Sequence, residues 1–238
     1  MPLTISELKA RVESLPPLIA SNIWQERCLQ LREKILTDNP EIFLQWPTVN
    51  STMFVANAPY LINELTPLKI QDPGFGGPVM YSANLSGNYI HQGYHLKQWQ
   101  DKTGKQVGNL GHIVEFGGGY GAMAVICRQL GFEGDYAIID LPEFSLLQEY
   151  YLSNTGYLDK VQFVSEFSGD CDLLIAIHSL SEVDLATRSL TLESIQAKHA
   201  LFVYSCEYEG IDNLAWFKQL PGQKWVTPHY TNQVYQVR

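Results

Sequence analysis

The sequence predicts an α/β protein with a mostly parallel sheet and a helical region in front of it. After Gly111, short apolar runs alternate with longer helical stretches, as in parallel strands joined by covering helices. A glycine-rich stretch follows the first of these runs directly. The last residues alternate apolar and polar side chains around a turn. We therefore expect a seven-stranded sheet, in which five strands are parallel and two form a terminal antiparallel hairpin.

The first hundred residues predict helices and irregular backbone. Thr4 and Glu7 form a capping-box pattern that begins one helix, and Asn22 begins a second. The segment from Pro67 to Gly93 is rich in glycine, proline, asparagine and tyrosine, so we expect turns there and interpret it as a loop wall or lid. A further helix is expected from about Tyr89 to Gln100.

The parallel strands are expected at five short apolar runs. These are His112–Phe116, Tyr136–Ile139, Val161–Val164, Leu173–Ile177 and Leu201–Tyr204. Helices are expected over Ala122–Leu130 and Pro142–Ser153. We divide the chain into residues 1–104, a helical region that could serve as a substrate cover or as an interface in a homodimer, and residues 105–238, the α/β region.

Composition argues against several classes of function. Lys and Arg number 16 against 25 Asp and Glu, for a net charge of -9, and the sequence has no basic cluster. Nucleic acid is therefore a poor partner, because binding to its backbone depends on cations that release counterions. No run of about 18 apolar residues occurs, so we expect no contact with a membrane. The four widely spaced cysteines fit reduced thiols and a cytoplasmic location.

The strongest motif is IVEFGGGYGAMA, in which an apolar run leads through a glycine-rich loop into an apolar helix. Glycines are favoured where the backbone turns sharply from strand to helix and approaches a ligand closely. We therefore expect Gly117, Gly118, Gly119 and Gly121 to form the floor of a cofactor site. The alternative is a tight turn without a ligand.

Two acidic residues favour one kind of cofactor over another. Gly117, Gly119 and Ala122 also match a dinucleotide-binding spacing. However, Glu115 lies just before the loop, where a carboxylate would repel a pyrophosphate and attract the ammonium group of a methionine moiety. Asp140 ends the next strand roughly 20 residues beyond the first glycine, the spacing of an acid that binds a ribose. Without a ligand, Asp140 would be a helix cap or a surface acid.

The segments IVEFGGGYG and IIDLPEFSLLQEYYLS resemble the sugar O-methyltransferases, a branch of the class I S-adenosylmethionine-dependent methyltransferases. The resemblance covers about Gly111 to Tyr208. It implies the Rossmann-like methyltransferase fold, S-adenosyl-L-methionine as cofactor, and an acceptor hydroxyl on a sugar or another small natural product. It also implies roles for single residues: Glu115 and the glycines for the methionine part, Asp140 for the ribose, and Leu141, Glu166 and Phe167 for the adenine.

His178 is the predicted general base. It follows the fourth strand, at the sheet edge where open α/β folds bind ligands. An imidazole is suited to removing a proton near neutral pH. The segment IHSLSEVD is also similar to a region of small-molecule O-methyltransferases in which a histidine deprotonates the acceptor. Alternatively, His178 packs under the cofactor or caps a helix. We expect Glu182 to begin the following helix.

Aromatic and histidine side chains predict the acceptor pocket. Tyr89, His91, Tyr94 and His95 in NYIHQGYHLKQW would form one wall, and Tyr208 after the fifth strand another. His91 and His95 also have the spacing of two metal ligands on a helix, but no acidic residue lies beside them and Gly93 weakens the helix. We therefore expect no metal.

Two other functions stay open at this point. An NAD(P)-dependent oxidoreductase would need a Tyr-x-x-x-Lys pair or an equivalent, and the C-terminal half of the sequence has none. A catalytically inactive protein that only binds the cofactor would be marked by loss of the base, whereas His178 is present.

Overall fold

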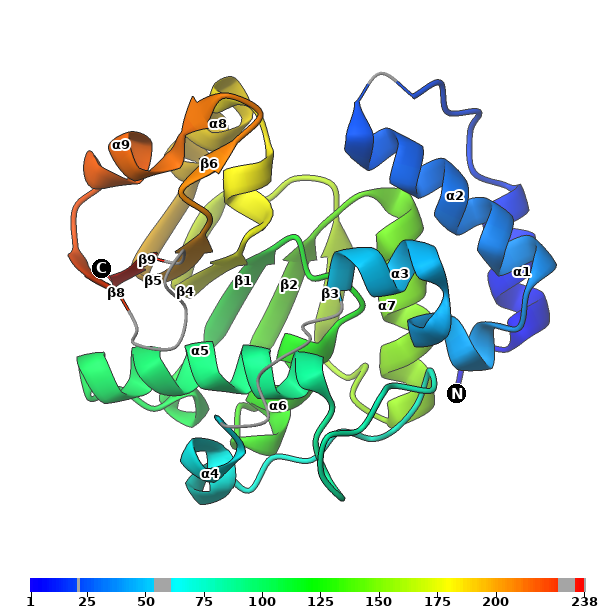
Figure 1. The fold of residues 1–238 in the computed structure, drawn as a ribbon, viewed down its shortest axis with the longest axis horizontal. Coiled ribbons are helices and arrows are strands. Elements are labelled where there is room, and N and C mark those ends of the chain that lie inside the picture. Colours follow the sequence, from blue (N-terminus) through cyan, green and yellow to red (C-terminus); the bar gives the residue numbers. More distant parts are fainter. Residues whose placement is uncertain (21, 54–60, 227–233, 238) are drawn as a thin grey trace. The chain divides into compact units, whose positions relative to one another are not determined.

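The computed structural model describes residues 1–20, 22–53, 61–226 and 234–237 (Figure 1). By packing, the chain divides into two compact units. What we call the helical unit consists of Met1–Tyr94, Gly119–Leu130 and Leu141–Asp159, and the sheet unit consists of His95–Gly118, Gly131–Asp140 and Lys160–Arg238. The predicted division between residues 104 and 105 separates two functional regions rather than two packing units, and it stays a prediction.

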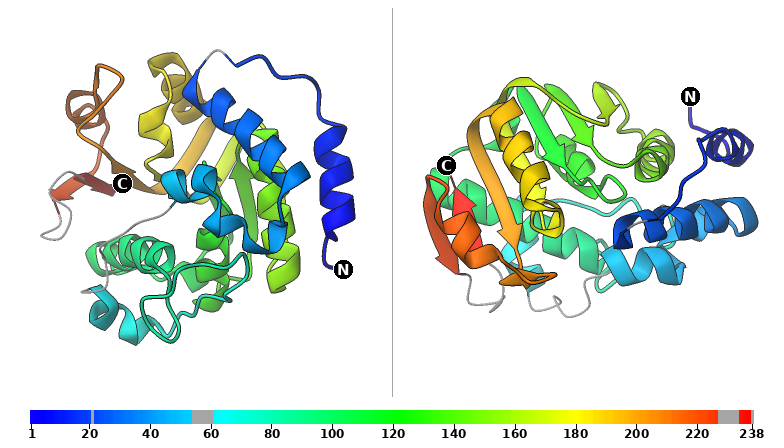
Figure 2. Two further views of the ribbon diagram at one scale, coloured as in Figure 1. Left: turned by 45° about the vertical axis from the view of Figure 1, so that its right-hand side comes forward. Right: turned by 90° about the horizontal axis from the view of Figure 1, so that it is seen from above.

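The helical unit contains most of the helices. They are α1 (Ile5–Glu13), α2 (Ile23–Thr37), α3 (Pro47–Met53), α4 (Ile62–Leu65), α6 (Ala122–Gln129) and α7 (Pro142–Thr155), with short 3-10 helices η1 (Pro40–Gln45) and η3 (Thr66–Leu68). Figure 2 shows α1 and α2 beside α7. Ion pairs of Arg11 with Glu149 and of Arg32 with the buried Glu143 join these helices.

The two N-terminal helix starts are as predicted. The Thr4 hydroxyl accepts a hydrogen bond from the Glu7 amide while the Glu7 side chain accepts one from the Thr4 amide, which forms the capping box. The Asn22 side chain accepts from the amide of Gln25. Each bond satisfies backbone groups that the first turn of a helix leaves unpaired.

The glycine-rich DPGFGGP segment is irregular, as predicted, and is fixed against η1. The Gly76 carbonyl accepts from the Leu44 amide at 2.9 Å, and the Gly77 carbonyl accepts from the Gln45 side chain at 3.1 Å. A Cβ at Gly76 would lie 2.4 Å from the Phe43 ring, so only glycine fits this approach. The irregular backbone ends earlier than expected, because helix α5 (Gly87–Thr103) already begins after Ser86.

The sheet unit holds a single large sheet. Its strands are β1 (His112–Phe116), β2 (Asp135–Ile139), β3 (Val161–Val164), β4 (Gly169–Ile177), β5 (Ile195–Tyr204), β8 (Gln223–Val226) and β9 (Val234–Val237), in the order β3-β2-β1-β4-β5-β9-β8 (Figure 1). β1 to β5 pair in parallel, at all five predicted positions. β9 pairs antiparallel with β5 and β8. The turn of the predicted hairpin falls in residues 227–233, outside the described residues.

One face of the sheet packs on helices of the same unit. Figure 2 shows α8 (Leu185–Ser194) along β5. Leu192 of α8 and Phe217 of α9 (Asn213–Lys218) join a core with apolar side chains of the strands, such as Val114 and Leu174. A two-stranded ribbon, β6 (Glu207–Tyr208) and β7 (Ile211–Asp212), precedes α9.

The crossover from β3 to β4 is unusually short. Only residues 165–168 connect these two parallel strands, whereas a crossover in a parallel sheet usually includes a helix. Phe167 lies in this connection and packs against the core of the sheet. Phe167 therefore covers part of the sheet at a place where a crossover helix would ordinarily pack.

Candidate functional site

Three predicted residues follow three neighbouring strands of the sheet. The amides of Gly117, Asp140 and His178 donate to the carbonyls of Ile139, Val164 and Val203, at 2.8, 3.2 and 2.7 Å. Each bond extends a strand pairing by one residue beyond β1, β2 and β4. Because these strands are parallel and adjacent, the three residues stand at one edge of the sheet. Between β1 and β4 the strand order reverses direction, which is where open α/β sheets bind ligands.

Glu115 is a buried carboxyl group on β1. Its side chain is 3% exposed and accepts a hydrogen bond of 2.8 Å from the hydroxyl of Tyr136 on β2. Burial raises the pKa of Glu115 to about 8; the Tyr136 hydrogen bond opposes this rise and the negative charge of Asp140 adds to it. No ion pair involves Glu115 among the residues that the structure describes. A buried acid of this kind is suited to a cationic ligand group.

The first glycine of the loop is required by backbone conformation and by packing. Gly117 has φ of +74°, and a Cβ there would lie 2.2 Å from the Cβ of Ser179. Ser179 follows β4, and its hydroxyl donates a short hydrogen bond to the carbonyl of Phe116. The ends of β1 and β4 are thus tied together beside the loop, through a contact that spans 63 residues of sequence.

From Gly119 onward the glycine loop belongs to the helical unit, whereas Gly118 still belongs to the sheet unit. Gly119 and Gly121 have φ of +59° and +97°. The Gly119 carbonyl accepts from the side chain of Gln148 on α7 at 3.0 Å, and a Cβ on Gly121 would lie 3.2 Å from Leu152. Gly118 is not among the residues with positive φ. The loop therefore has the tight, side-chain-free backbone that the motif predicts.

His178 has an unusual backbone conformation, with φ of +66° and ψ of -35°. Positive φ is uncommon in residues other than glycine and clusters at functional sites. Its carbonyl accepts from the amide and the hydroxyl of Ser181. Burial of the imidazole lowers the pKa of His178 to about 4, so the ring is neutral at neutral pH. A neutral imidazole can accept a proton.

A buried arginine holds the segment that follows His178. The Arg188 guanidinium on α8 is 0% exposed and donates to the carbonyls of Val183 and Ser181, at 2.9 and 2.7 Å, and to Asn213 Oδ1 at 2.7 Å. It also lies over the Trp216 ring. No ion pair among the described residues includes Arg188. Its charge is stabilised by carbonyl dipoles and an aromatic face, and these bonds fix residues 181–183.

Glu182 does not begin α8 as we expected. It is the last residue of the short 3-10 helix η5 (Ser179–Glu182). Asp184 caps α8 instead, and its side chain accepts from the Thr187 amide at 3.0 Å. An aspartate is the better cap because its short side chain reaches back to the first turn.

The residues predicted for the adenine are dispersed. Leu141 is the N-cap residue of α7, in the helical unit. Glu166 is exposed, in the connection between β3 and β4. The Phe167 ring packs edge-on against the His112 ring at 5.3 Å, at the amino end of β1. The structure therefore does not bring Phe167 to the edge where Gly117 lies, and its predicted role stays a prediction.

The residues predicted to line the acceptor pocket are mostly buried. On α5, Tyr89, His91, Tyr94 and His95 are at most 3% exposed. The boundary between the two units falls between Tyr94 and His95. The Tyr89 hydroxyl bonds that of Tyr151 at 2.7 Å, so Tyr89 is a core residue of the helical unit. Tyr208 is half-buried, on β6 of the sheet unit.

Neither a metal cluster nor a membrane span is found in the described part of the chain. No group of three or more His, Cys, Asp or Glu side chains there could hold a metal ion. None of the helices formed by the described residues has the length and apolarity needed to cross a bilayer.

Several residues of the site have no signal in the sequence pattern. Ser179, Gln148 and Arg188 act through contacts with residues far away in the chain. Ser179 follows His178, so the sequence indicates that it lies near the predicted site. The sequence does not indicate that Ser179 bonds the carbonyl of Phe116.

Comparisons with known families and with curated proteins find no match for this chain. Among solved structures, a mitomycin 7-O-methyltransferase is 11% identical with a TM-score of 0.46, over 100% of this chain and 73% of that chain. An rRNA methylase from Escherichia coli is 10% identical with a TM-score of 0.47, over 98% of each chain. Similarity this low carries no information about the reaction or substrate of this chain.

Proposed function

We propose that this chain is an S-adenosylmethionine-dependent O-methyltransferase that acts on a hydroxyl group of a sugar or another small natural product. The observation that carries the proposal is Glu115, a buried carboxyl group without a cationic partner among the described residues, two positions before the turn at Gly117. A cationic amino-acid group would favour the ionised form of this carboxyl group and pair with it, whereas the phosphates of a dinucleotide would be repelled by the ionised form.

The residues present fit S-adenosylmethionine. Glu115 would pair with its ammonium group, and the glycine loop, which has no Cβ at Gly117 or Gly119, would allow close approach of the methionine part. Asp140, one residue beyond β2, would accept the ribose hydroxyls. When bound, this cofactor supplies a methyl group activated by a sulfonium.

In this proposal His178 takes the acceptor proton. The neutral imidazole of His178 would accept the proton that the acceptor hydroxyl loses when it takes the methyl group that the cofactor would supply. A base with a pKa of about 4 is weak, but it is in the correct protonation state throughout the neutral range. Alignment of the acceptor then contributes a large share of the rate enhancement.

The charge of the chain supports a small acceptor rather than RNA. The sequence has 25 acidic and 16 basic residues, and no basic cluster appears in it. A protein that binds a phosphate backbone needs cations for that contact. The acceptor is therefore proposed to be a small molecule.

Thermal shift measurements with two ligands test the proposal. A ligand that binds only the native state raises its melting temperature. S-adenosylhomocysteine, which carries the same ammonium and ribose groups, is expected to raise the melting temperature, and NADH is not. Stabilisation by NADH alone would overturn the proposal in favour of an oxidoreductase.

A variant that removes the carboxyl group of Glu115 tests the observation on which the proposal rests. Glu115→Gln keeps the shape of the side chain and is expected to weaken S-adenosylhomocysteine binding by about 30-fold or more, since it removes one partner of a buried charge pair. Glu133→Gln, at an exposed position of the same unit, is the matched control and should bind as the wild type does. If both variants bind S-adenosylhomocysteine as tightly as the wild type does, Glu115 has no role in cofactor binding.

A further inference from the structure

Glu115 has apolar neighbours on both sides within the sheet. Its partners in register are Ile138 on β2 and Ile175 on β4, both 0% exposed. Side chains in register on neighbouring parallel strands point to the same face of a sheet. The two strands therefore offer the carboxyl group neither a charge nor a hydrogen bond at its own level.

Tyr136 is the residue of β2 that reaches this carboxyl group. It lies two positions before Ile138, so its side chain is on the same face as that of Glu115, and it is 0% exposed. Its hydroxyl donates to Oε2 of Glu115 at 2.8 Å. The Phe132 ring packs edge-on against the Tyr136 ring at 6.1 Å between centroids. The bond to Oε2 leaves the other carboxyl oxygen, Oε1, for a proton or a ligand.

The surroundings favour the neutral form of Glu115. A buried carboxylate needs a cation or several donors, and the phenol supplies one neutral donor. No ion pair among the described residues includes Glu115. In the same part of the chain, the titratable groups that act on it are Tyr136 and Asp140, and the Asp140 charge opposes ionisation. Because burial outweighs the Tyr136 bond, the pKa of Glu115 rises to about 8, and the acid is mostly protonated at neutral pH.

We propose that Tyr136 is a positioning residue of the cofactor site, and that binding of the cofactor's ammonium group at Oε1 releases the Glu115 proton. The inference rests on the proposed function. Since Oε2 accepts from Tyr136, the proton of the neutral acid lies on Oε1. On binding, this O–H bond breaks, the proton passes to solvent, and the ammonium group pairs with the carboxylate. The phenol keeps its bond to Oε2 in both states and stabilises the ionised one.

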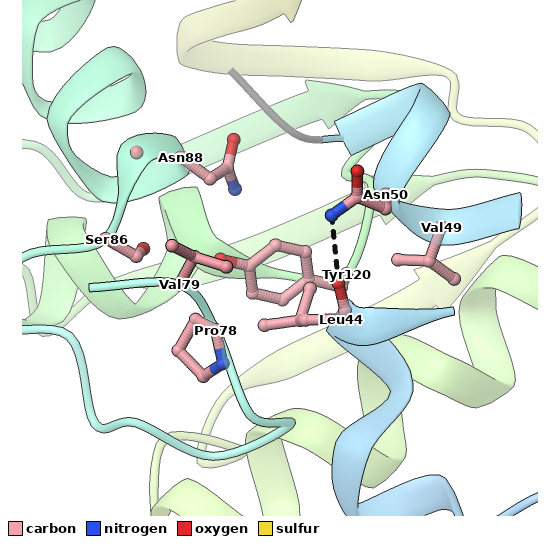
Figure 3. Close-up of a pocket in the computed structure, with 9 residues that line it drawn as sticks. Leu44, Val49, Asn50, Pro78, Val79, Ser86, Asn88 and Tyr120 are labelled. Atoms are coloured by element: carbon pink, nitrogen blue, oxygen red, sulfur yellow. Dashed lines mark hydrogen bonds between the residues drawn. The ribbon is translucent and has the colours of Figure 1, made fainter. Parts of the chain in front are cut away.

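A comparison with Tyr120 shows what is particular about Tyr136. Tyr120, in the helical unit, is also a buried tyrosine, and Figure 3 shows its ring with Ser86 and Asn88 among the side chains around it. Both are uncharged hydrogen-bonding neighbours of the Tyr120 hydroxyl. Neither of these side chains ionises at ordinary pH. Tyr136 bonds a group that does, so ligand binding at Glu115 depends on pH.

Calorimetric titration of the full chain with S-adenosylhomocysteine tests the inference. Titrations at one pH in phosphate and in Tris, whose ionisation enthalpies differ, give the number of protons released for each ligand bound. For an acid with a pKa of about 8, we expect release of about 0.9 protons at pH 7 and about 0.5 at pH 8. The affinity should also rise by about ninefold from pH 6 to pH 7.

Two variants that keep the shape of the side chain separate the roles of the pair. Glu115→Gln has no proton to release, so its weaker binding should be independent of pH between 6 and 8. Tyr136→Phe removes a bond that favours the ionised acid. It should weaken binding at pH 7 by about 10-fold and raise the release at pH 8 from about 0.5 to about 0.9 protons. A merely structural role of Tyr136 would not raise the number of protons released.

Tyr204→Phe is the matched control. Tyr204 is a buried tyrosine on β5 of the same unit, and its ring stacks on Phe217 at 3.8 Å between centroids. This variant should bind S-adenosylhomocysteine and release protons as the wild type does. The inference is wrong if the wild type binds without releasing a proton at pH 7, if Glu115→Gln releases as many protons, or if Tyr136→Phe behaves as Tyr204→Phe does.

The same titrations separate this inference from the proposed function. Binding without proton release refutes only the role of the Glu115 and Tyr136 pair. Absence of binding by the wild type throughout pH 6 to 8 refutes the cofactor assignment on which that role depends.

Discussion

Glu115 and Tyr120 are two buried polar side chains that flank Gly117 to Gly119 in the sequence, and they differ in the groups around them. Glu115, in the sheet unit, accepts one hydrogen bond and has no cationic partner among the described residues. The Tyr120 hydroxyl, in the helical unit, has the uncharged side chains of Asn88 and Ser86 as hydrogen-bonding neighbours. A buried carboxyl group that ionises needs a cation, whereas a buried phenol is satisfied by neutral hydrogen-bonding groups.

The sheet unit carries the titratable groups of the proposed site. Glu115 lies on β1, and Asp140 and His178 follow β2 and β4 directly. In the proposed function, cofactor binding and chemistry therefore depend on the sheet unit. Each of the following changes tests one part of this comparison.

The largest effect is expected for His178→Asn. Asparagine is tolerated at positive φ better than most residues, so the backbone of the segment should be kept. Loss of the general base should lower turnover by about 10²- to 10⁴-fold. The affinity for S-adenosylhomocysteine should change less than twofold. Steady-state kinetics and calorimetric titration measure the turnover and the affinity.

The control for this variant is His199→Asn, at a histidine on β5 of the same unit. Turnover should be nearly unchanged there. Should His178→Asn retain more than a tenth of the wild-type turnover, the base is another residue.

Residues that a local motif brings together could be predicted from the sequence. The five parallel strands, the glycine loop and the positions of Asp140 and His178 after their strands follow from apolar runs and short spacings. Glu115 belongs to the same short motif. Such features depend on neighbours a few residues away, so a single sequence contains them.

Residues that act over long sequence distances could not be predicted. Ser179 contacts Gly117, and Arg188 bonds Asn213, through the folding of the chain. Tyr120 lies inside the predicted loop, yet its ring packs against Phe43 and Tyr151, which are distant in the sequence. Tyr89, which the sequence pattern assigns to the acceptor pocket, is buried in the core of the helical unit.

The next effect in size is expected for Arg188→Met, which tests how the catalytic edge is held. Methionine has a similar length but leaves the carbonyls of Ser181 and Val183 and the Asn213 side chain without their donor. The free energy of unfolding should fall by about 3 kcal/mol. Chemical denaturation measures it. Arg128→Met, at a half-buried arginine of the helical unit that bonds the carbonyl of Asp159, is the control and should cost under about 1 kcal/mol.

The pH dependence of the free energy of unfolding distinguishes the contribution of Glu115 from that of His178. Burial raises the pKa of Glu115 to about 8 from an ordinary 4.5, so between these values the native state binds more protons and stability falls as pH rises. Burial lowers the pKa of His178 to about 4 from 6.5, so between these values the unfolded state binds more protons and stability rises with pH. The two slopes oppose each other below pH 6.5, and only the fall remains from there to about 8.

In that upper window the free energy of unfolding should fall by about 1.4 kcal/mol per pH unit at most. Denaturant titrations at several pH values, on wild type and Glu115→Gln, isolate this contribution as a difference. The variant should show no fall between pH 6.5 and 8. Saturating S-adenosylhomocysteine should also reduce the fall in the wild type, because an ammonium partner favours the ionised carboxylate. A wild-type slope equal to that of the variant would contradict the raised pKa.

The smallest effect is expected for Tyr120→Phe. It removes a buried hydroxyl whose hydrogen-bonding neighbours are the side chains of Asn88 and Ser86, so it should lower the free energy of unfolding by about 1 kcal/mol. Tyr151→Phe leaves the Tyr89 hydroxyl unpaired and should lower it by a similar amount. Chemical denaturation without ligand measures both. A stabilised Tyr120→Phe would mean that the Tyr120 hydroxyl has no partner in the folded chain, because only an unsatisfied buried hydroxyl is better replaced by hydrogen.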